Sequence, residues 1–184
     1  RWHDGVMRPV GGWRTRSDTA SAAALRGMLT WTDNSSDRWI GVGSYNKLYI
    51  YNSSGVRFDI TPAGLTAGRE DAVSFTGFGG GPYGSYAYGV ARPDTVRIQP
   101  ATSWDLEPWG EYMLACNEDD GKIYQWQLNT GVVSAVLSNA PTSNSGCIVT
   151  EERFLFALGA GGNPRKVQWS DRENNNLWTP AATN

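Results

Sequence analysis

D-R-W-I-G-V-G-S-Y-N-K-L-Y-I-Y-N-S-S-G-V-R-F-D-I, residues 37–60, is the stretch that decides the fold of this chain. Apolar and polar residues alternate in three short runs, and Gly43-Ser44 and residues 52–55 break the pattern between them. Alternation with a period of two is typical of β-strands, and turn-forming residues between short strands are typical of hairpins. The stretch therefore predicts three antiparallel strands in a meander.

Two further segments repeat this pattern, residues 111–137 and residues 152–171. Each of the three copies opens with an aromatic residue: Trp39, Tyr112 and Phe154. The chain has only three lysines, and each begins the strand after the first turn of a copy: Lys47, Lys122 and Lys166. Lysines placed by chance would not fall at the same point of every copy. The three segments are therefore repeats of one structural unit.

A fourth strand is predicted before the first two copies, because a tryptophan stands at the same distance before each opening aromatic: Trp31 and Trp104. Without the insertion described below, the period is about 40 to 45 residues, as in four-stranded β-propeller blades. The predicted fold class is all-β: a β-propeller of four-stranded antiparallel blades. Closed propellers have about four to eight blades, so the three blades at residues 26–60, 101–138 and 146–180 are an incomplete set.

The alternation also predicts the individual strands of each blade. In the first blade they are residues 26–32, 38–44, 47–52 and 56–60; in the second, residues 101–106, 111–117, 122–129 and 132–138; in the third, residues 147–151, 153–159, 165–170 and a short one at Leu177-Trp178. All belong to one propeller domain. The chain opens without a methionine and ends without a closing element, so we expect the remaining blades to come from a longer chain.

Residues 1–25 precede the first blade. Two short apolar pieces, Val6-Met7 and Val10 with Trp13, predict a hairpin at a sheet edge, where the proline between them is tolerated. The alanine-rich residues 17–25 predict a short helical turn, which its first serine or aspartate could cap.

Residues 61–100 interrupt the repeats with an insertion rich in glycine and tyrosine that has no core period. Its stretch G-F-G-G-G-P-Y-G lacks the G-K-[ST] ending of a phosphate-binding loop, which argues against phosphate binding. Two interpretations remain: a flexible surface loop, or an arm that packs aromatic side chains against a partner. Aromatic residues are enriched at interface cores, so four of them favour the interface arm: Phe78, Tyr83, Tyr86 and Tyr88.

Composition limits the possible partners. The formal net charge is -2, charged residues make up 18% of the chain, and the basic residues are scattered. The basic stripe of a dedicated nucleic-acid binder is missing, so we expect no tight binding to free DNA. No apolar run approaches the roughly 20 residues that cross a bilayer. Cys116 and Cys147 lie in different repeats, and buried free thiols are favoured over a disulfide, which stays possible.

Catalytic groups are few. His3 is the only histidine, and two acidic turns at residues 33–37 and 118–121 lack the register of a calcium-binding EF-hand loop. Nine tryptophans could form sugar-stacking platforms or serve a glycosidase with paired carboxylates. Their positions instead recur with the repeat, as packing residues do: Trp31 with Trp104, and Trp126 with Trp169. The sequence therefore predicts no enzyme, no cofactor and no metal site.

Several motifs together resemble a known family: R-W-H-D-G-V-M-R-P-V-G-G-W, R-W-I-G-V-G-S-Y-N-K-L-Y-I-Y followed by F-D-I-T-P, G-F-G-G-G-P-Y-G, and E-E-R-F-L-F-A-L-G-A-G-G-N-P-R-K-V-Q-W-S-D with L-W-T-P-A-A-T-N. They are similar to tail proteins of tailed bacteriophages, and most of all to the propeller-containing nozzle, or packaged-DNA stabilisation, proteins of short-tailed phages. The resemblance spans nearly the whole chain. Family members are several hundred residues long, so this chain departs in length.

The resemblance implies a structural virion protein without catalytic residues. Such proteins assemble as a ring, usually of six copies, below the portal and adaptor, where they extend the DNA channel and help to retain and deliver the genome. The implied partners are other copies, adaptor and other tail proteins, and double-stranded DNA that passes without sequence-specific contacts. The implied location is the phage tail, after assembly in the host cytoplasm. Two alternatives remain: a receptor- or carbohydrate-binding propeller, and a hydrolase that uses Glu118 or Asp119.

Overall fold

The computed structural model describes residues 2–7, 10–12, 14–72, 89 and 99–179. Within these residues the chain forms antiparallel β-sheets and a single short 3₁₀ helix, η1 (Ala160–Gly162). The all-β class predicted from the sequence is confirmed.

Sheet 1 contains the stretch quoted at the outset. Its strands pair in chain order: β3 (Leu25–Thr32), β4 (Arg38–Ser44), β5 (Leu48–Tyr51) and β6 (Arg57–Asp59). Successive side chains of a strand point to opposite faces. Val42 and Tyr49 are paired and share one face, while Leu48 and Ile50 lie on the other. Sheet 1 is therefore apolar on both faces, as a sheet between two neighbours would be.

Sheets 2 and 3 are meanders of the same kind. Sheet 2 consists of β7 (Trp104–Trp109), β8 (Tyr112–Asn117), β9 (Ile123–Trp126) and β10 (Ala135–Val136). Sheet 3 consists of β11 (Gly146–Val149), β12 (Leu155–Leu158) and β13 (Val167–Trp169). Strands that are neighbours in the sequence are neighbours in each sheet, because short turns join antiparallel strands.

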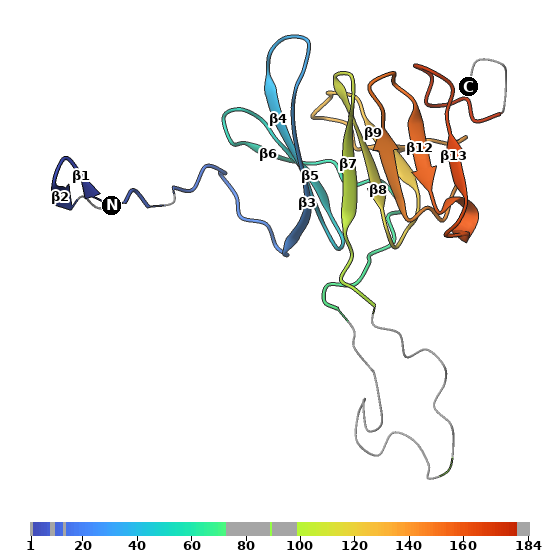
Figure 1. Cartoon of the computed structure of the whole chain (residues 1–184), viewed down its shortest axis with the longest axis horizontal. Coiled ribbons are helices and arrows are strands. Elements are labelled where there is room, and N and C mark those ends of the chain that lie inside the picture. The colour runs from blue at the N-terminus through green and yellow to red at the C-terminus, as the bar shows by residue number, and fades with distance from the viewer. Residues whose placement is uncertain (1, 8–9, 13, 73–88, 90–98, 180–184) are drawn as a thin grey trace.

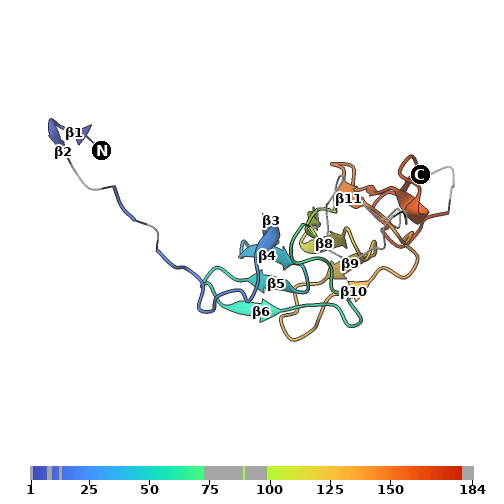
Figure 2. The same ribbon diagram turned by 90° about the horizontal axis from the view of Figure 1, so that it is seen from below.

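The three sheets are arranged around their first strands. β7 contacts both β3 and β11, so the first strands lie side by side. The sheets stand next to one another in chain order (Figure 1), and β6 forms the edge of sheet 1 opposite to β3 (Figure 2). Sheets that meet along their first strands and carry the later strands outward form a radial array. The chain thus has an incomplete, β-propeller-like fold.

Two hydrophobic cores fill the spaces between the sheets. The first core, between sheets 1 and 2, is rich in aromatic residues: Trp31, Leu48, Ile50, Ile60, Trp104, Met113, Ala115, Tyr124 and Trp126. The second core, between sheets 2 and 3, has more small side chains: Trp109, Leu114, Cys116, Ile123, Leu137, Ala140, Cys147, Leu155, Ala157 and Ala160. Burial of these side chains is the main force that holds the sheets together.

Glycine allows sheets 1 and 2 to approach closely. A Cβ atom at Gly43 would lie 2.3 Å from the Trp104 ring, and one at Gly41 would lie 2.4 Å from the Met113 sulfur. The indole N–H of Trp104 donates to the Ser44 carbonyl at 2.7 Å. The missing side chains therefore make room for the large residues of the neighbouring sheet.

The helical turn predicted for residues 17–25 is wrong, since these residues are bent or extended. The Asp18 amide donates to the Gly55 carbonyl at 3.1 Å, and the Arg57 amide donates to the Asp18 carboxylate at 3.3 Å. The Arg57 guanidinium also donates to the Ala20 carbonyl at 2.6 Å. Bonds to the β5–β6 turn replace the internal bonds of a helix, which is marginal at nine residues.

The predicted N-terminal hairpin is present but wrong in its pairing. β1 (Trp2–His3) pairs with β2 (Val6–Met7), and Val10 takes no part. Asp4 and Gly5 form the turn with φ angles of 52° and 74°, as a tight two-residue hairpin requires. The hairpin lies apart from the three sheets instead of at a sheet edge (Figure 1).

The strand predicted at residues 101–106 is displaced, because β7 begins only at Trp104. Thr102 lies outside the strand, and its amide donates to the Arg69 carbonyl at 3.0 Å. The partner of Thr102 is thus the insertion, which a local alternation pattern cannot reveal.

The short strand predicted at Leu177-Trp178 is wrong as well. The Asp171 amide donates to the Leu177 carbonyl at 2.8 Å, and the Trp178 indole donates to the Asn175 carbonyl at 2.8 Å. These local bonds make a compact turn, so sheet 3 has three strands among the described residues.

Candidate functional site

Neither a metal cluster nor a membrane helix is found in the described part of the chain. No group of three or more His, Cys, Asp or Glu side chains there could hold a metal ion. No helix of these residues has the length and apolarity to span a bilayer. The distinctive surfaces of the described residues are the root of the insertion, the first strands, the end faces of the sheets and two hollows.

The two ends of the insertion meet at a root beside sheet 2. The Arg69 amide donates to the Thr102 hydroxyl at 2.6 Å, and the Arg69 side chain donates to the Pro100 carbonyl at 2.8 Å. Its guanidinium also pairs with the Asp119 carboxylate at 2.5 Å. Because the Asp119 side chain is only 15% exposed, water screens this ion pair incompletely. The insertion therefore leaves and re-enters the body at one fixed place.

The four aromatic residues predicted to form the interface arm lie outside the described residues: Phe78, Tyr83, Tyr86 and Tyr88. The structure shows instead where the insertion that contains them joins the sheets. The Gly68 amide donates to the Tyr45 carbonyl at 2.8 Å, and the Thr66 amide donates to the Asp120 carboxylate at 3.2 Å. The root thus lies across the turns of sheets 1 and 2.

The Asp120 carboxylate is the buried centre of this root. Its side chain is 1% exposed, accepts the Tyr124 hydroxyl at 2.9 Å and lies 3.2 Å from the Lys122 ammonium. Burial, followed by the hydrogen bond to Asp120, raises the pKa of Tyr124. A buried carboxylate is costly unless it is paired. Lys122, one of the three repeat lysines, therefore has a structural role.

All three repeat lysines hold the same place in the fold. Each stands one residue before the third strand of its sheet: Lys47 before β5, Lys122 before β9 and Lys166 before β13. Lys47 pairs with Asp59 at 2.8 Å, and this hydrogen bond raises the pKa of Lys47. Lys166 is fixed by its backbone, which accepts from the Ala160 amide at 3.1 Å.

The opening aromatic residues stand at the start of the second strands: Trp39 in β4, Tyr112 in β8 and Phe154 just before β12. Trp39 contacts the ring of Trp126 edge to face, with centroids 5.4 Å apart. Its indole N–H donates to the Asp33 carboxylate at 3.0 Å, which lowers the pKa of Asp33. Asp33 also accepts two backbone amides of its own turn, so its carboxylate has protein donors on both oxygens.

The first strands β3, β7 and β11 carry three charged residues: Arg26, Asp105 and Glu107. Burial and the nearby charge of Glu118 raise the pKa of Asp105, although a hydrogen bond from the Cys147 amide opposes the shift. Burial and the charge of Asp105 raise the pKa of Glu107. The inner edge of the array therefore carries more acidic than basic groups.

Sheet 3 presents an apolar end face that no other described sheet covers. Ile148, Phe156 and Trp169 pair across its strands, and Leu158 pairs with Val167 in the adjoining row. The rings of Phe156 and Trp169 stack with centroids 5.9 Å apart.

The packing role predicted for Trp169 is wrong, because Trp169 is 44% exposed whereas Trp126 is 2% exposed. When the two strands are aligned by their lysines, Trp169 is equivalent to the residue before Trp126 and not to Trp126 itself. A shift of one residue turns a strand side chain to the opposite face.

Sheet 1 presents the opposite end face, with Val42, Tyr49 and Tyr51 as its core. Residues 15–17 run beside this face and leave a hollow of about 880 Å³. Ile40, Val42 and Tyr51 line the hollow, together with Arg38. This space is called the sheet 1 hollow below.

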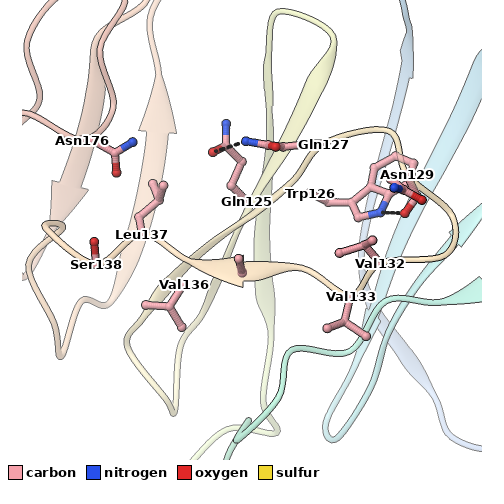
Figure 3. A pocket seen from close by; sticks show the side chains of 11 residues that line it. Gln125, Trp126, Gln127, Asn129, Val132, Val133, Val136, Leu137, Ser138 and Asn176 are labelled. Atoms are coloured by element: carbon pink, nitrogen blue, oxygen red, sulfur yellow. Dashed lines mark hydrogen bonds between the residues drawn. The ribbon is translucent and has the colours of Figure 1, made fainter.

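A second hollow, of about 410 Å³, lies at the outer edge of sheet 2 (Figure 3). Val133 and Val136 line it, and the Gln127 amide donates to the Gln125 side chain at 3.4 Å within it. The indole N–H of Trp126 donates to the Asn129 carbonyl at 3.1 Å. Its lining holds amides, hydroxyls and aliphatic groups without an ionisable side chain, so it offers no group for acid–base catalysis.

The residues considered for hydrolysis have structural partners. Glu118 accepts the Ser103 hydroxyl at 2.7 Å, and Asp119 binds Arg69 at the root. His3 lies in β1, far along the chain from both.

Cys116 and Cys147 are buried and unbridged, which confirms the predicted free thiols. A hydrogen bond with Cys116, together with burial, raises the pKa of the Cys147 thiol. A buried thiol that resists ionisation is a poor nucleophile.

Taken together, these features define an all-β protein with an incomplete, β-propeller-like fold. No family model, curated protein or solved structure matches the chain.

Proposed function

We propose that this chain is a structural subunit of a bacteriophage tail, of the nozzle type that extends the DNA channel below the portal and adaptor. The observation that carries the proposal is the side-by-side packing of β3, β7 and β11, with two buried cores behind them. Such an array is stiff because protein cores pack as densely as organic crystals. A conduit for DNA under pressure needs stiff walls.

The charge of the inner edge supports the same proposal. Arg26 is the one basic residue of the three first strands, and its guanidinium lies 3.6 Å from Asp71. Phosphate binding depends on lysines and arginines that replace counterions. DNA would therefore slide past this edge without being held.

The motifs that resemble phage nozzle proteins support the assignment, and the proposed ring of about six copies rests on this resemblance. In this proposal the insertion is the arm between neighbouring subunits or adaptor proteins. The root made by Arg69, Thr102 and Asp119 supports it, since it presents the insertion from a fixed place.

The ring can be tested with the purified full chain. A variant with serine at Phe78, Tyr83, Tyr86 and Tyr88, here the arm variant, removes the proposed contact. We expect rings or tubes of the unmodified chain in negative-stain images at high concentration, and none for the arm variant. A matched control is Val133→Ser, which removes an exposed apolar group elsewhere. A sample that contains only one-chain or two-chain particles would contradict the ring.

The same preparation tests the behaviour toward DNA. We expect duplex DNA to bind no more tightly than the non-specific range of about 10⁻⁴ to 10⁻⁶ M at physiological salt. Nanomolar binding in a filter assay would show that the chain holds DNA, against the role of a passive channel.

One observation favours a second candidate, a carbohydrate-binding propeller. Trp169 is 44% exposed and stacked on Phe156, and a broad aromatic surface of this kind can stack on a sugar ring. A glycan array would decide: binding that is lost in Trp169→Ala and kept in Trp178→Ala supports this candidate. If no glycan on the array binds, the carbohydrate-binding candidate is rejected and the structural role stands.

A further inference from the structure

Two thiols face each other across the contact between sheets 2 and 3. Cys116 lies in β8 and Cys147 in β11, and each is 1% exposed. Side chains of a strand alternate between its two faces, and both cysteines belong to the core between these two sheets. The chain has no other cysteine. The two sulfur atoms therefore point into one core from opposite sides.

Asp105 in β7 positions the two cysteines relative to each other. It pairs with Cys116 in the register of sheet 2. The Cys147 thiol donates to the Asp105 carbonyl oxygen at 4.0 Å, and the Cys147 amide donates to the Asp105 carboxylate. Gly146 allows this approach, because a Cβ atom there would collide with the carboxylate. Cys147 is thus held beside the residue that lies directly opposite Cys116.

The two thiols are near enough to interact directly. A hydrogen bond between them, followed by burial, raises the pKa of the Cys147 thiol. β11 contacts β8 as well as β7, so the backbones that carry the two sulfur atoms are neighbours. A disulfide requires neighbouring backbones whose cysteines point toward each other, because its S–S bond is only about 2.0 Å long. Cys116 and Cys147 have this arrangement.

We infer that Cys116 and Cys147 form a disulfide between sheets 2 and 3 when a small disulfide, such as oxidised glutathione, serves as the oxidant. One cysteine thiolate attacks a sulfur atom of the oxidant, which gives a mixed disulfide and releases one small thiol. The other cysteine thiolate then attacks the protein sulfur of the mixed disulfide, so that the bond between the cysteines forms and the second small thiol leaves. The two cysteines lose two electrons, which the oxidant gains, and their two protons pass to the small thiols.

This disulfide forms slowly and then lasts. The thiolate is the reactive form, and burial together with the raised pKa of Cys147 keeps it scarce in the folded chain. The oxidant reaches the sulfur atoms when sheet 3 separates from sheet 2, and the completed bond then prevents another separation. The disulfide thus reinforces the contact that has the smaller core side chains. The inference rests on the fold and does not depend on a role in a phage tail.

The bridge is measured in the full chain, in mixtures of oxidised and reduced glutathione. Mass spectrometry reports the bridged fraction by the loss of two hydrogen atoms, and peptide mapping without reductant identifies the linked cysteines. We expect the effective concentration of the two thiols to be at least about tenfold higher in buffer than in concentrated urea, because the fold holds them together. Bridging should raise the melting temperature by roughly 3 to 10 °C, since it closes a loop of about 30 residues.

A thiol moved to the other face of sheet 3 is the matched control. The double variant Cys147→Ala with Ile148→Cys keeps two cysteines in a loop of almost the same length, but Ile148 is 47% exposed and points away from Cys116. Its thiols should bridge in urea as the parent does, and much less in buffer. Cys147→Ala alone should show no rise in melting temperature with the oxidant. Circular dichroism of each variant must match the parent, and Ala115→Cys with Cys116→Ala replaces the double variant if it does not. An effective concentration no higher in buffer than in urea, or equal bridging of parent and control in buffer, would overturn the inference.

Discussion

The two contacts between neighbouring sheets are built from different residues. Between sheets 1 and 2, the indole N–H groups of Trp31, Trp104 and Trp126 each donate to a backbone carbonyl, so large aromatic rings are buried without a lost hydrogen bond. Between sheets 2 and 3, smaller side chains fill the core, and Asp105 and Glu107 lie beside it. The same arrangement of strands can thus be stabilised by aromatic rings whose N–H groups are all hydrogen-bonded, or by small side chains with charged residues beside the core. We expect the first contact to be stronger and the second to respond to pH.

The largest effect is expected from Trp126→Ala in the first contact. Trp126 is 2% exposed and packs edge to face against Trp31 and Trp39. Removal of its ring leaves a cavity, and we expect the free energy of unfolding to fall by about 4 kcal/mol. Urea titration measures the loss, and Val133→Ala at an exposed site is the control. A loss near 1 kcal/mol would show that the aromatic core is not the main support.

Leu155→Ala probes the second contact. Leu155 is 0% exposed, and its side chain is smaller than that of Trp126. We expect a loss of about 3 kcal/mol in the same titration. Leu177→Ala, at a position that is 38% exposed, should cost much less. If Leu155→Ala cost more than Trp126→Ala, the ranking of the two contacts would be reversed.

Gly43→Ala tests how closely sheets 1 and 2 approach. The added methyl would lie 2.3 Å from the Trp104 ring, so sheets must separate or the indole must move. Overpacking of this kind costs about 2 kcal/mol. Gly131→Ala is the matched control, since the added methyl would meet only an Asn129 side-chain oxygen, at 3.4 Å. Equal stability of the two variants would mean that the first contact yields without strain.

The smallest effect, and one of opposite sign, is expected from Asp105→Asn. The pKa of Asp105 is raised in the folded state, so the folded chain binds more protons than the unfolded chain as pH rises above the usual value of 3.8. Stability is therefore lost as pH rises through the raised pKa and stays low above it. Asparagine removes this cost. Because Asp105 is only partly buried and water still screens its charge, the gain at pH 7 should be below about 1 kcal/mol.

Thermal unfolding at several pH values measures this difference. The advantage of Asp105→Asn should vanish at about pH 3, where the aspartate itself is protonated. Glu151→Gln, which removes one carboxylate from an exposed turn, is the matched control. An advantage that persists at low pH would assign the effect to packing instead of charge.

Much of the fold was predictable because its signals are local. Alternating residues and tight turns predict strands wherever the chain pairs with its own neighbour, and the lysines fixed the equivalent strands of the three sheets. Predictions that depended on distant partners were less reliable. Asp18 bonds to the β5–β6 turn instead of capping a helix, and Thr102 joins Arg69 instead of β7.

The candidate site was less predictable than the fold. The ion pair between Arg69 and Asp119 joins residues far apart in the sequence, and no pattern links them. The exposure of Trp169 was predictable from its distance to the repeat lysine. Trp169 stands three residues after Lys166, whereas Trp126 stands four residues after Lys122, so the two side chains point to opposite faces of their sheets. The sheet 1 hollow depends on the path of residues 15–17, which follow no repeat.

The closed root of the insertion has a further consequence for how this chain can change. Arg69 and Thr102 bond to each other directly, so the segment between them leaves and rejoins the sheets at one point. The strands can therefore keep their positions whatever the length of that segment. The entropic cost of closing a loop grows only slowly with loop length, so such a segment can be lengthened, shortened or exchanged at little cost in free energy. An unrelated peptide or a small domain grafted there should leave the three sheets in place. The molecule thus separates a packed frame of sheets from an insertion whose length and sequence can change without disturbing that frame.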